Sequence, residues 1–159
     1  MPVISLKEVT SANRESILRL KLAEVQHQFI ASNARTLGQA AEAPEAWLRA
    51  IYADDVLVGL LLLHDEHLRE PPREIGYYFL WRMMIDIHHQ GNGYGKQAID
   101  LVIKYVSTRP HAKRLLSSYL PGEGGPEGFY LHYGFTPTGN KIGEDIEIEI
   151  PLVKNLALD

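Results

Sequence analysis

The sequence predicts a single α/β domain built around a mixed sheet. Runs rich in aromatic and branched residues alternate along the chain with segments whose apolar residues recur at helical spacing. The 159 residues are 45% hydrophobic and 23% charged, which is the composition of one ordinary globular domain. The elements follow the order β-α-α-β-β-β-α-β-α-β, and no repeat or long linker interrupts them. One layered α/β domain over residues 1–159 is therefore expected.

The first third of the chain predicts a strand followed by interrupted helices. Residues 2–9 alternate weakly between apolar and polar side chains and predict the first strand. Polar residues suited to N-caps follow, and apolar residues then recur at roughly helical spacing over residues 17–30, which predicts one long helix or two broken ones. Ser32 and Asn33 are expected to interrupt this pattern, and a second short helix is expected over residues 37–43.

The middle of the chain predicts three strands. Residues 47–53 and 56–64 are both rich in β-forming side chains and flank Asp54 and Asp55, so they predict a hairpin around a two-residue turn. After a loop that contains two prolines, residues 75–87 are rich in aromatic and branched side chains. They predict a long central strand.

The last third predicts a helix, a strand, a short helix and a final β region. Residues 97–106 carry apolar side chains at helical spacing, and residues 114–120 favour a strand. A loop rich in glycine and proline precedes a short helix that ends at Tyr133. A last β region is expected from Gly134 onward, because isoleucines alternate with glutamates at Ile146, Glu147, Ile148, Glu149 and Ile150.

Charge and cysteine content narrow the classes of function. The net charge of −4, without a long basic run, argues against nucleic acids and anionic membranes as partners. The chain has no cysteine, which excludes a disulfide framework, a Cys-ligated metal or cluster and a cysteine nucleophile. No signal peptide is visible in the first ten residues, and the longest apolar stretch, residues 56–63, is too short to span a bilayer. We therefore expect a cytoplasmic protein with neither nucleic acid nor membrane as partner.

Two histidines at short spacing raise the question of a metal site. His64 and His67 could form a metal-binding pair, but no third ligand follows at a recognisable spacing. We therefore expect no metal. The acidic side chains between residues 144 and 149 are expected on the solvated face of the last strand.

Residues 83–96 carry the most informative pattern, because an apolar strand runs into a glycine-rich turn that opens a helix. Glycines allow a tight turn, and the amides of the turn and the helix N-terminus favour a phosphate or pyrophosphate. A dinucleotide-binding turn would need glycine in place of Lys96 and an acidic residue near Leu115, and a P-loop would need glycine in place of Gln90. Both patterns fail. On this segment alone, a purely structural glycine turn stays an alternative.

Two motifs together resemble the GNAT N-acetyltransferase superfamily. The first is Gln90-x-x-Gly93-x-Gly95 after an apolar strand, which is similar to the acetyl-CoA signature of that family. The second is the segment 128–135, which resembles the late helix of the family and its terminal aromatic-x-x-x-Gly-Phe. Their order along the chain is that of the family, and the resemblance covers essentially the whole chain. It implies the GNAT acyl-CoA N-acyltransferase fold and acetyl-CoA as co-substrate.

The resemblance also implies roles for individual residues. The amides of the glycine turn would hold the CoA pyrophosphate, and the end of the preceding strand would pair with the pantetheine arm. The amide of Ile85 would polarise the thioester carbonyl, as a one-donor oxyanion hole does. Tyr130 would protonate the departing thiolate, although an ordinary aromatic residue on a helix face is the alternative. The residues implied in cofactor binding are Met84, Ile85, Ile87, Gln90, Gly91, Asn92, Gly93, Tyr94, Gly95, Lys96 and Tyr130.

The chain departs from the family pattern at two places. Glu123 stands in the loop before the late helix, where many members carry an asparagine. No carboxylate lies between Glu74 and Asp86, where many members carry a glutamate as general base. Deprotonation through water, or through a carboxylate from another element, is left open, and the base is unassigned. Because the chain lacks a nucleophile motif, we expect direct amine attack in a ternary complex, in which proximity could supply much of the rate.

Three segments, residues 26–33, 78–86 and 124–130, resemble the bacterial diamine, spermidine and spermine N-acetyltransferases. This resemblance implies a small-molecule polyamine acceptor, which carboxylates and aromatic faces can hold. A homodimer is expected from the family. Another small amine, an antibiotic or a protein N-terminus stays open as acceptor, and a non-catalytic acyl-CoA-binding sensor is the alternative from a different class. The candidate acceptor contacts are Glu24, Gln28, Phe29, Tyr77, Tyr78 and Trp81.

Overall fold

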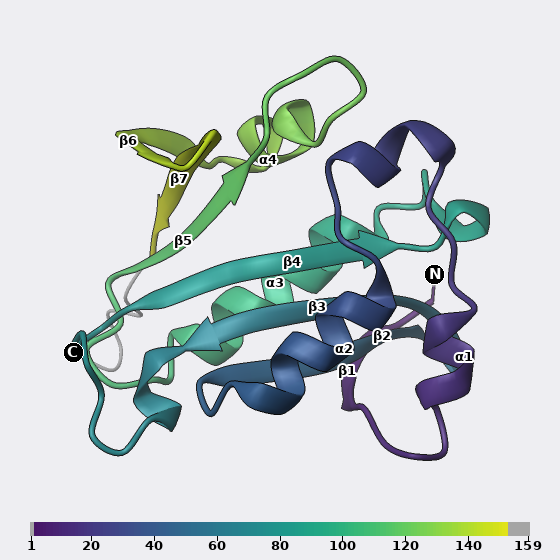
Figure 1. The fold of residues 1–159 in the computed structure, drawn as a ribbon, viewed down its shortest axis with the longest axis horizontal. Coiled ribbons are helices and arrows are strands. Elements are labelled where there is room, and N and C mark those ends of the chain that lie inside the picture. Colours follow the sequence, from purple (N-terminus) through teal and green to yellow (C-terminus); the bar gives the residue numbers. More distant parts are fainter. Residues whose placement is uncertain (1, 153–159) are drawn as a thin grey trace.

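A seven-stranded sheet forms the centre of the protein, with strand order β1-β2-β3-β4-β5-β7-β6 (Figure 1). The computed structural model describes residues 2–152, so the expected domain range of 1–159 extends beyond the described residues at both ends. The strands are β1 Ile4–Glu8, β2 Ala46–Ala53, β3 Val56–Asp65, β4 Tyr78–Ile85, β5 Arg114–Tyr119, β6 Thr136–Ile142 and β7 Asp145–Pro151. The helices are α1 Arg14–Leu18, α2 Asn33–Glu42, α3 Tyr94–Val106 and α4 Glu127–Tyr133, with short 3-10 helices η1 Glu24–Gln28, η2 Glu66–Leu68 and η3 Ile87–His89.

Helices cover both faces of the sheet, and each face has its own apolar core. Helices α1 and α2 contribute Ile17 and Leu37 to a cluster with Leu60 of β3. Helix α3 contributes Ile99 to a second cluster, which includes Leu61 of the same strand. Neighbouring side chains on a strand point to opposite faces, so β3 is apolar on both sides, as its sequence of consecutive leucines requires.

The strand β4 separates from β5 part-way along its length. The two run parallel, but they are paired only at Phe79 with Leu116 and at Leu80 with Ser117. A register shift in the pairing with β3 follows, after which β4 stays paired with β3 as far as Ile85. Beyond Leu80, β5 continues beside β7 instead, and Figure 1 shows the two strands diverging. The second half of β4 therefore has a free edge inside the sheet.

The predicted mixed fold is confirmed, and four local details differ from prediction. Of the two forms expected over residues 17–30, the broken one is present, but its second piece is the 3-10 helix η1 rather than an α-helix. Ser32 starts the next helix rather than ending one, because its side chain accepts a hydrogen bond from the Arg35 amide as an N-cap. The central strand is shorter than the predicted 75–87. The final β region is a hairpin of two strands, since Gly143 adopts a positive φ between them.

The two histidines considered as a metal pair have structural partners instead. His64 Nε2 lies 2.8 Å from Glu66 Oε1, and His67 Nε2 accepts the Gly76 amide at 2.8 Å. Within residues 2–152 no three metal-ligating side chains gather at one place. None of the helices described is both long and apolar enough to cross a membrane.

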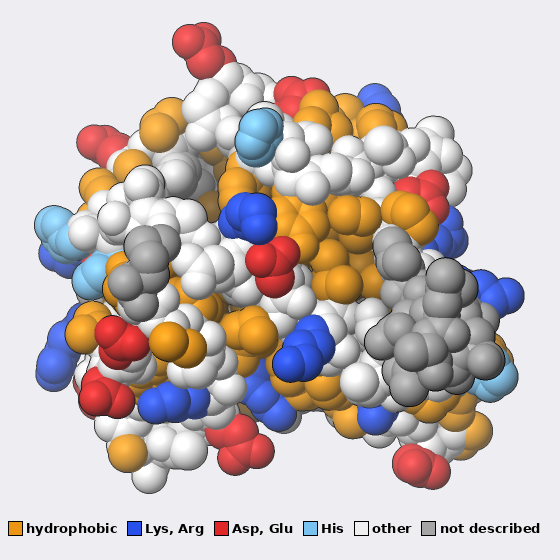
Figure 2. Space-filling view, turned by 180° about the vertical axis from the view of Figure 1, so that it is seen from behind, with side chains coloured by type: hydrophobic (Ala, Val, Ile, Leu, Met, Phe, Trp, Pro, Cys, Tyr) orange, Lys and Arg blue, Asp and Glu red, His pale blue; other side chains and the backbone are white. Residues whose placement is uncertain are grey.

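The face opposite α2 carries charges of both signs. In Figure 2 the Lys and Arg side chains on that face stand apart from one another, with Asp and Glu side chains between them. A binding surface for nucleic acid normally gathers its cationic side chains into one patch. The part of this face that residues 2–152 form therefore offers no concentrated basic surface.

Candidate active site

The glycine turn presents backbone amides at the start of α3. Gly91 and Gly93 adopt φ angles of 82° and 78°, a region where a side chain is strained. The first intrahelical bond runs from the Gln97 amide to the Gly93 carbonyl, so the amides of residues 94–96 lie before it and have no helical partner. Asn92 closes the turn by donating its side-chain N–H to the His89 carbonyl at 2.9 Å. The local sequence therefore builds an anion-binding helix start.

The amide of Ile85 points toward the gap between β4 and β5. The Asp86 amide donates to the Val58 carbonyl of the β3 side at 2.7 Å. Successive amides of a strand point to alternate edges, so the amide of Ile85 points away from β3. A Cβ at Gly59 would clash with the Met84 carbonyl, so glycine at this position lets β3 and β4 approach closely. Strand β3 thus supports β4 on the side opposite its free edge.

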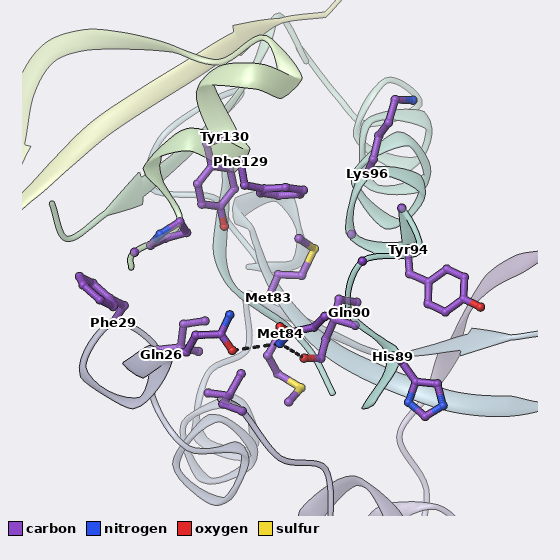
Figure 3. A pocket seen from close by; sticks show the side chains of 18 of the residues that line it. Gln26, Phe29, Met83, Met84, His89, Gln90, Tyr94, Lys96, Phe129 and Tyr130 are labelled. Atoms are coloured by element: carbon purple, nitrogen blue, oxygen red, sulfur yellow. Dashed lines mark hydrogen bonds between the residues drawn. The ribbon is translucent and has the colours of Figure 1, made fainter. Parts of the chain in front are cut away.

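A cavity of about 480 Å³ fills the gap between the glycine turn, the end of β4, η1 and α4 (Figure 3). Its wall is mostly apolar, with backbone amides of the turn at one end. Such a cavity has the size and character of a small-molecule site. The residues that line it are Leu22, Gln26, Phe29, Ile30, Met83, Met84, Ile85, His89, Gln90, Gly91, Gly93, Tyr94, Gly95, Lys96, Gly124, Gly125, Pro126, Phe129, Tyr130 and His132.

Tyr130 points its hydroxyl from α4 into this cavity, toward Met83 and Met84 (Figure 3). The side chain is only 7% exposed. Burial raises the pKa of Tyr130 to about 12, and the Ser117 hydroxyl acts in the opposite direction. The phenol therefore keeps its proton at neutral pH, which a proton donor requires.

Two glutamines connect η1 to the glycine turn. Gln90 Nε2 donates to the Ile85 carbonyl at 2.8 Å and to Gln26 Oε1 at 2.9 Å (Figure 3). Gln26 Oε1 also accepts the Ala23 amide at 3.1 Å, which fixes the start of η1. On the other side of the cavity, Phe29 packs on Gly122 and Gly125. The segment η1 is thus anchored at both ends across the cavity.

A second cavity of about 280 Å³ adjoins the first and shares Phe29, Ile30, Met83, Pro126 and Tyr130 with it. The two cavities therefore meet at the free edge of β4. The other lining residues of the second cavity are Ala31, Phe79, Trp81, Arg82, Ser118, Tyr119, Leu120, Ile142 and Asp145.

Three polar groups of the second cavity have defined partners. Asp145 Oδ2 accepts the Ser118 hydroxyl at 3.1 Å, and the Tyr119 hydroxyl donates to Glu127 Oε1 at 3.0 Å. The Arg82 guanidinium lies over the Trp81 ring and donates to Gln39 of α2. The cavity thus combines aromatic faces with a half-buried carboxylate, and its one arginine is tied to a helix.

Most residues predicted to bind the cofactor line the first cavity. Two do not. The side chain of Asn92 closes the turn, and the Ile87 amide donates to the Lys21 carbonyl at 2.7 Å in η3 instead of extending the strand. Those on the cavity wall are Met84, Ile85, Gln90, Gly91, Gly93, Tyr94, Gly95, Lys96 and Tyr130.

Only two of the six predicted acceptor contacts line the second cavity. Phe29 and Trp81 line the second cavity, whereas Glu24 and Gln28 are exposed on η1 and line neither cavity. Tyr78 is fully buried and its hydroxyl donates to the Pro110 carbonyl at 2.6 Å, so the prediction of an acceptor contact there does not fit. Tyr77 lines neither cavity and stacks on Phe79. Sequence reasoning missed Gln26, Tyr119, Phe129 and Asp145.

Comparison with known proteins agrees with this geometry. The sequence pattern described as "Acetyltransferase (GNAT) family" matches residues 10–135. The chain belongs to this family. The predicted fold and the role of acetyl-CoA as co-substrate are thereby confirmed.

Similar sequences and structures cover almost the whole chain. A "Probable spermine N(1)-acetyltransferase" of Bacillus subtilis subsp. natto (strain BEST195) is 29% identical over 96% of this chain and 99% of its own length. A "Spermine/spermidine N(1)-acetyltransferase" of Bacillus subtilis (strain 168) is 28% identical over the same shares. The structure of spermidine N-acetyltransferase from Vibrio cholerae, in complex with CoA and spermine, has a TM-score of 0.70 at 14% identity, over 94% of this chain and 95% of that one. At that identity the likeness concerns the fold alone.

We expect Gln26→Ala to raise the KM for acetyl-CoA by about two- to tenfold, because a single neutral hydrogen bond to Gln90 is lost. Gln26→Glu keeps an acceptor oxygen for Gln90 and should stay near the wild-type value. Steady-state kinetics of both variants measures this, with the thermal midpoint as a control for folding. An unchanged KM in Gln26→Ala would show that η1 does not hold the glycine turn.

Proposed function

We propose that this protein transfers the acetyl group of acetyl-CoA to a primary amine of a polyamine such as spermidine or spermine. The observation that carries the proposal is the meeting of two cavities at the free edge of β4, beside Met83 and Tyr130. The first cavity has a lining suited to acyl-CoA, and the second has a lining suited to a cationic organic molecule. Direct attack of the amine on the thioester in a ternary complex needs such an arrangement.

The first cavity fits acetyl-CoA through its backbone. The amides of residues 94–96 would hold the pyrophosphate, and the outward amide of Ile85 would stabilise the charge that develops on the thioester oxygen. Tyr130 would protonate the sulfur as the C–S bond breaks, since a phenol carries its proton at neutral pH.

The second cavity supports a polyamine acceptor. The Asp145 carboxylate can pair with an ammonium group, and the ring faces of Phe79 and Trp81 can contact a cationic chain. The two Bacillus subtilis relatives carry names that specify spermine or spermidine. Their identity of 28–29% over the full length supports the same acceptor class here. The net charge of −4 is compatible with a cationic substrate.

A binding protein without catalysis is the alternative from another class. Such a sensor would keep the first cavity but would not need the second one or a protonated Tyr130 beside it. The presence of both features favours the enzyme. Assembly as a homodimer and a cytoplasmic location stay expectations drawn from the family and from composition.

We expect spermidine to produce saturable release of free CoA from acetyl-CoA, above the rate without amine. Because the chain has no cysteine, a thiol-reactive dye will report CoA without labelling the protein. If acetyl-CoA binds but neither spermidine nor spermine increases the release, the polyamine assignment is wrong. Release with other amines only would then identify a different acceptor, and release with none would favour the sensor.

We expect Tyr130→Phe to lower kcat by about 10²-fold or more while leaving the dissociation constant for acetyl-CoA unchanged, since only proton transfer to sulfur is lost. Steady-state kinetics together with calorimetric titration of acetyl-CoA measures both quantities. An equal loss of turnover and affinity would contradict the assigned role as acid.

We expect Asp145→Asn to raise the KM for spermidine by about tenfold with little change in kcat, because a charge-assisted contact is replaced by a neutral one. Asparagine keeps an oxygen that can accept the Ser118 hydroxyl. Butylamine, which has no second ammonium group, is the control substrate, and its KM should not change. A similar rise for both amines would argue against recognition of the distal charge.

A further inference from the structure

The first cavity, here called the cofactor cavity, has no carboxylate on its wall that could act as base for the attacking amine. The second cavity is called the acceptor cavity. Among the described residues, the ionisable side chains on the wall of the cofactor cavity are His89, Tyr94, Lys96, Tyr130 and His132. His89 Nδ1 lies 3.2 Å from Asp86 Oδ2 in η3, and His132 is exposed in the last turn of α4. A carboxylate that acts as base would therefore lie on the side of the acceptor.

We propose that Tyr119 and Glu127 form the pair that removes the proton from the attacking amine. The inference rests on the proposed amine acetylation. Tyr119 lines the acceptor cavity, is 4% exposed, and donates its hydroxyl to Glu127 Oε1 at 3.0 Å. Glu127 is half-buried in the first turn of α4, where solvent can still reach it. A tyrosine whose proton already lies on a hydrogen bond to a carboxylate can accept a second proton as it releases the first.

The pair lies on the same side of the sheet as the acid Tyr130. Ser117 and Tyr119 are two positions apart on β5 and point to one face, and the Ser117 hydroxyl is close enough to Tyr130 to affect its pKa. Glu127 precedes Tyr130 by one helical turn and shares its side of α4. Tyr119 and Tyr130 both line the second cavity, and Glu127 bonds to the first of them.

The other carboxylate of the acceptor cavity has a different position. Asp145 is bonded to Ser118, which points to the opposite face of β5 from Tyr119. Asp145 therefore lies on the far side of the strand from Glu127. It is placed to hold a distal ammonium group, whereas Tyr119 lies on the face of β5 that Ser117 shares.

The proposed transfer conserves protons and electrons. A neutral amine forms a C–N bond to the acetyl carbon, and its N–H proton passes to Tyr119 Oη, directly or through one water, while the Tyr119 proton passes to Glu127 Oε1. The C–S bond breaks, its electron pair leaves with sulfur, and Tyr130 protonates the thiolate. Glu127 then loses its proton to solvent and Tyr130 takes one from solvent. The net reaction is amine plus acetyl-CoA to amide plus CoA.

The decisive variant is Glu127→Gln, because glutamine still accepts the Tyr119 hydroxyl but cannot take its proton. Proton transfer predicts that kcat falls by about 10²-fold while the KM for acetyl-CoA and the thermal midpoint are unchanged. A purely structural hydrogen bond predicts normal turnover instead. Glu127→Asp keeps a carboxylate and should recover part of the rate. Glu144→Gln, at an exposed position of the β6–β7 turn, removes the same charge and should be fully active.

Tyr119→Phe and the double variant complete the experiment. If the two residues act as one path, the double variant should be no slower than either single variant. Each enzyme is assayed with spermidine and with butylamine, since proton removal is needed for any amine. A wild type active toward butylamine alone would overturn the polyamine assignment but not the pair. Full activity of Glu127→Gln toward an accepted amine would overturn the pair alone, and a wild type inactive toward every amine would overturn both.

Discussion

The divergence of β4 from β5 is the constraint on which the site depends. The two strands are bonded at only two register positions, after which each keeps a partner on its other side. Backbone amides on the inner edge of β4 would cost free energy if they were buried without a partner. An extended ligand that pairs with this edge satisfies them, and both cavities open onto it. The fold therefore creates a binding edge inside the sheet rather than along one of its outer strands.

Two local devices keep this edge in place. Gly59 allows β3 to approach the Met84 carbonyl, and the Gln90 side chain holds the Ile85 carbonyl from the glycine turn. The turn proposed to receive the phosphate end is thus bonded to Ile85, whose amide is proposed to face the reacting carbonyl. Through Gln26 the same network reaches η1, which borders the acceptor cavity at Phe29. The walls of the two cavities are consequently linked by one hydrogen-bonded framework.

Much of this could be predicted from the sequence, because strand, glycine turn and helix follow one another within residues 83–96 and their chemistry is local. Most of the residues that line the acceptor cavity could not be predicted from the sequence. The second of the two helical pieces that residues 17–30 allow is a 3-10 helix, so Gln26 rather than Glu24 or Gln28 faces the cofactor cavity. The sequence shows Tyr78 as an aromatic residue on the central strand, but only the packing of the sheet shows that it points into the core. Asp145 comes to the cavity through a hairpin that alternation alone did not reveal.

Asp145 and Glu127 lie on opposite sides of β5. Their positions give a physical reason why β4 has no glutamate where many family members carry one. A carboxylate on β4 would have to serve both as base and as a charge for the cationic acceptor. Here Ser118 and Tyr119, adjacent on β5 and pointing to opposite faces, each hold one carboxylate. The charge that attracts an ammonium group would also raise the pKa of that group and so hinder its deprotonation. Separating the two tasks across a strand keeps the binding charge away from the nitrogen that must lose its proton.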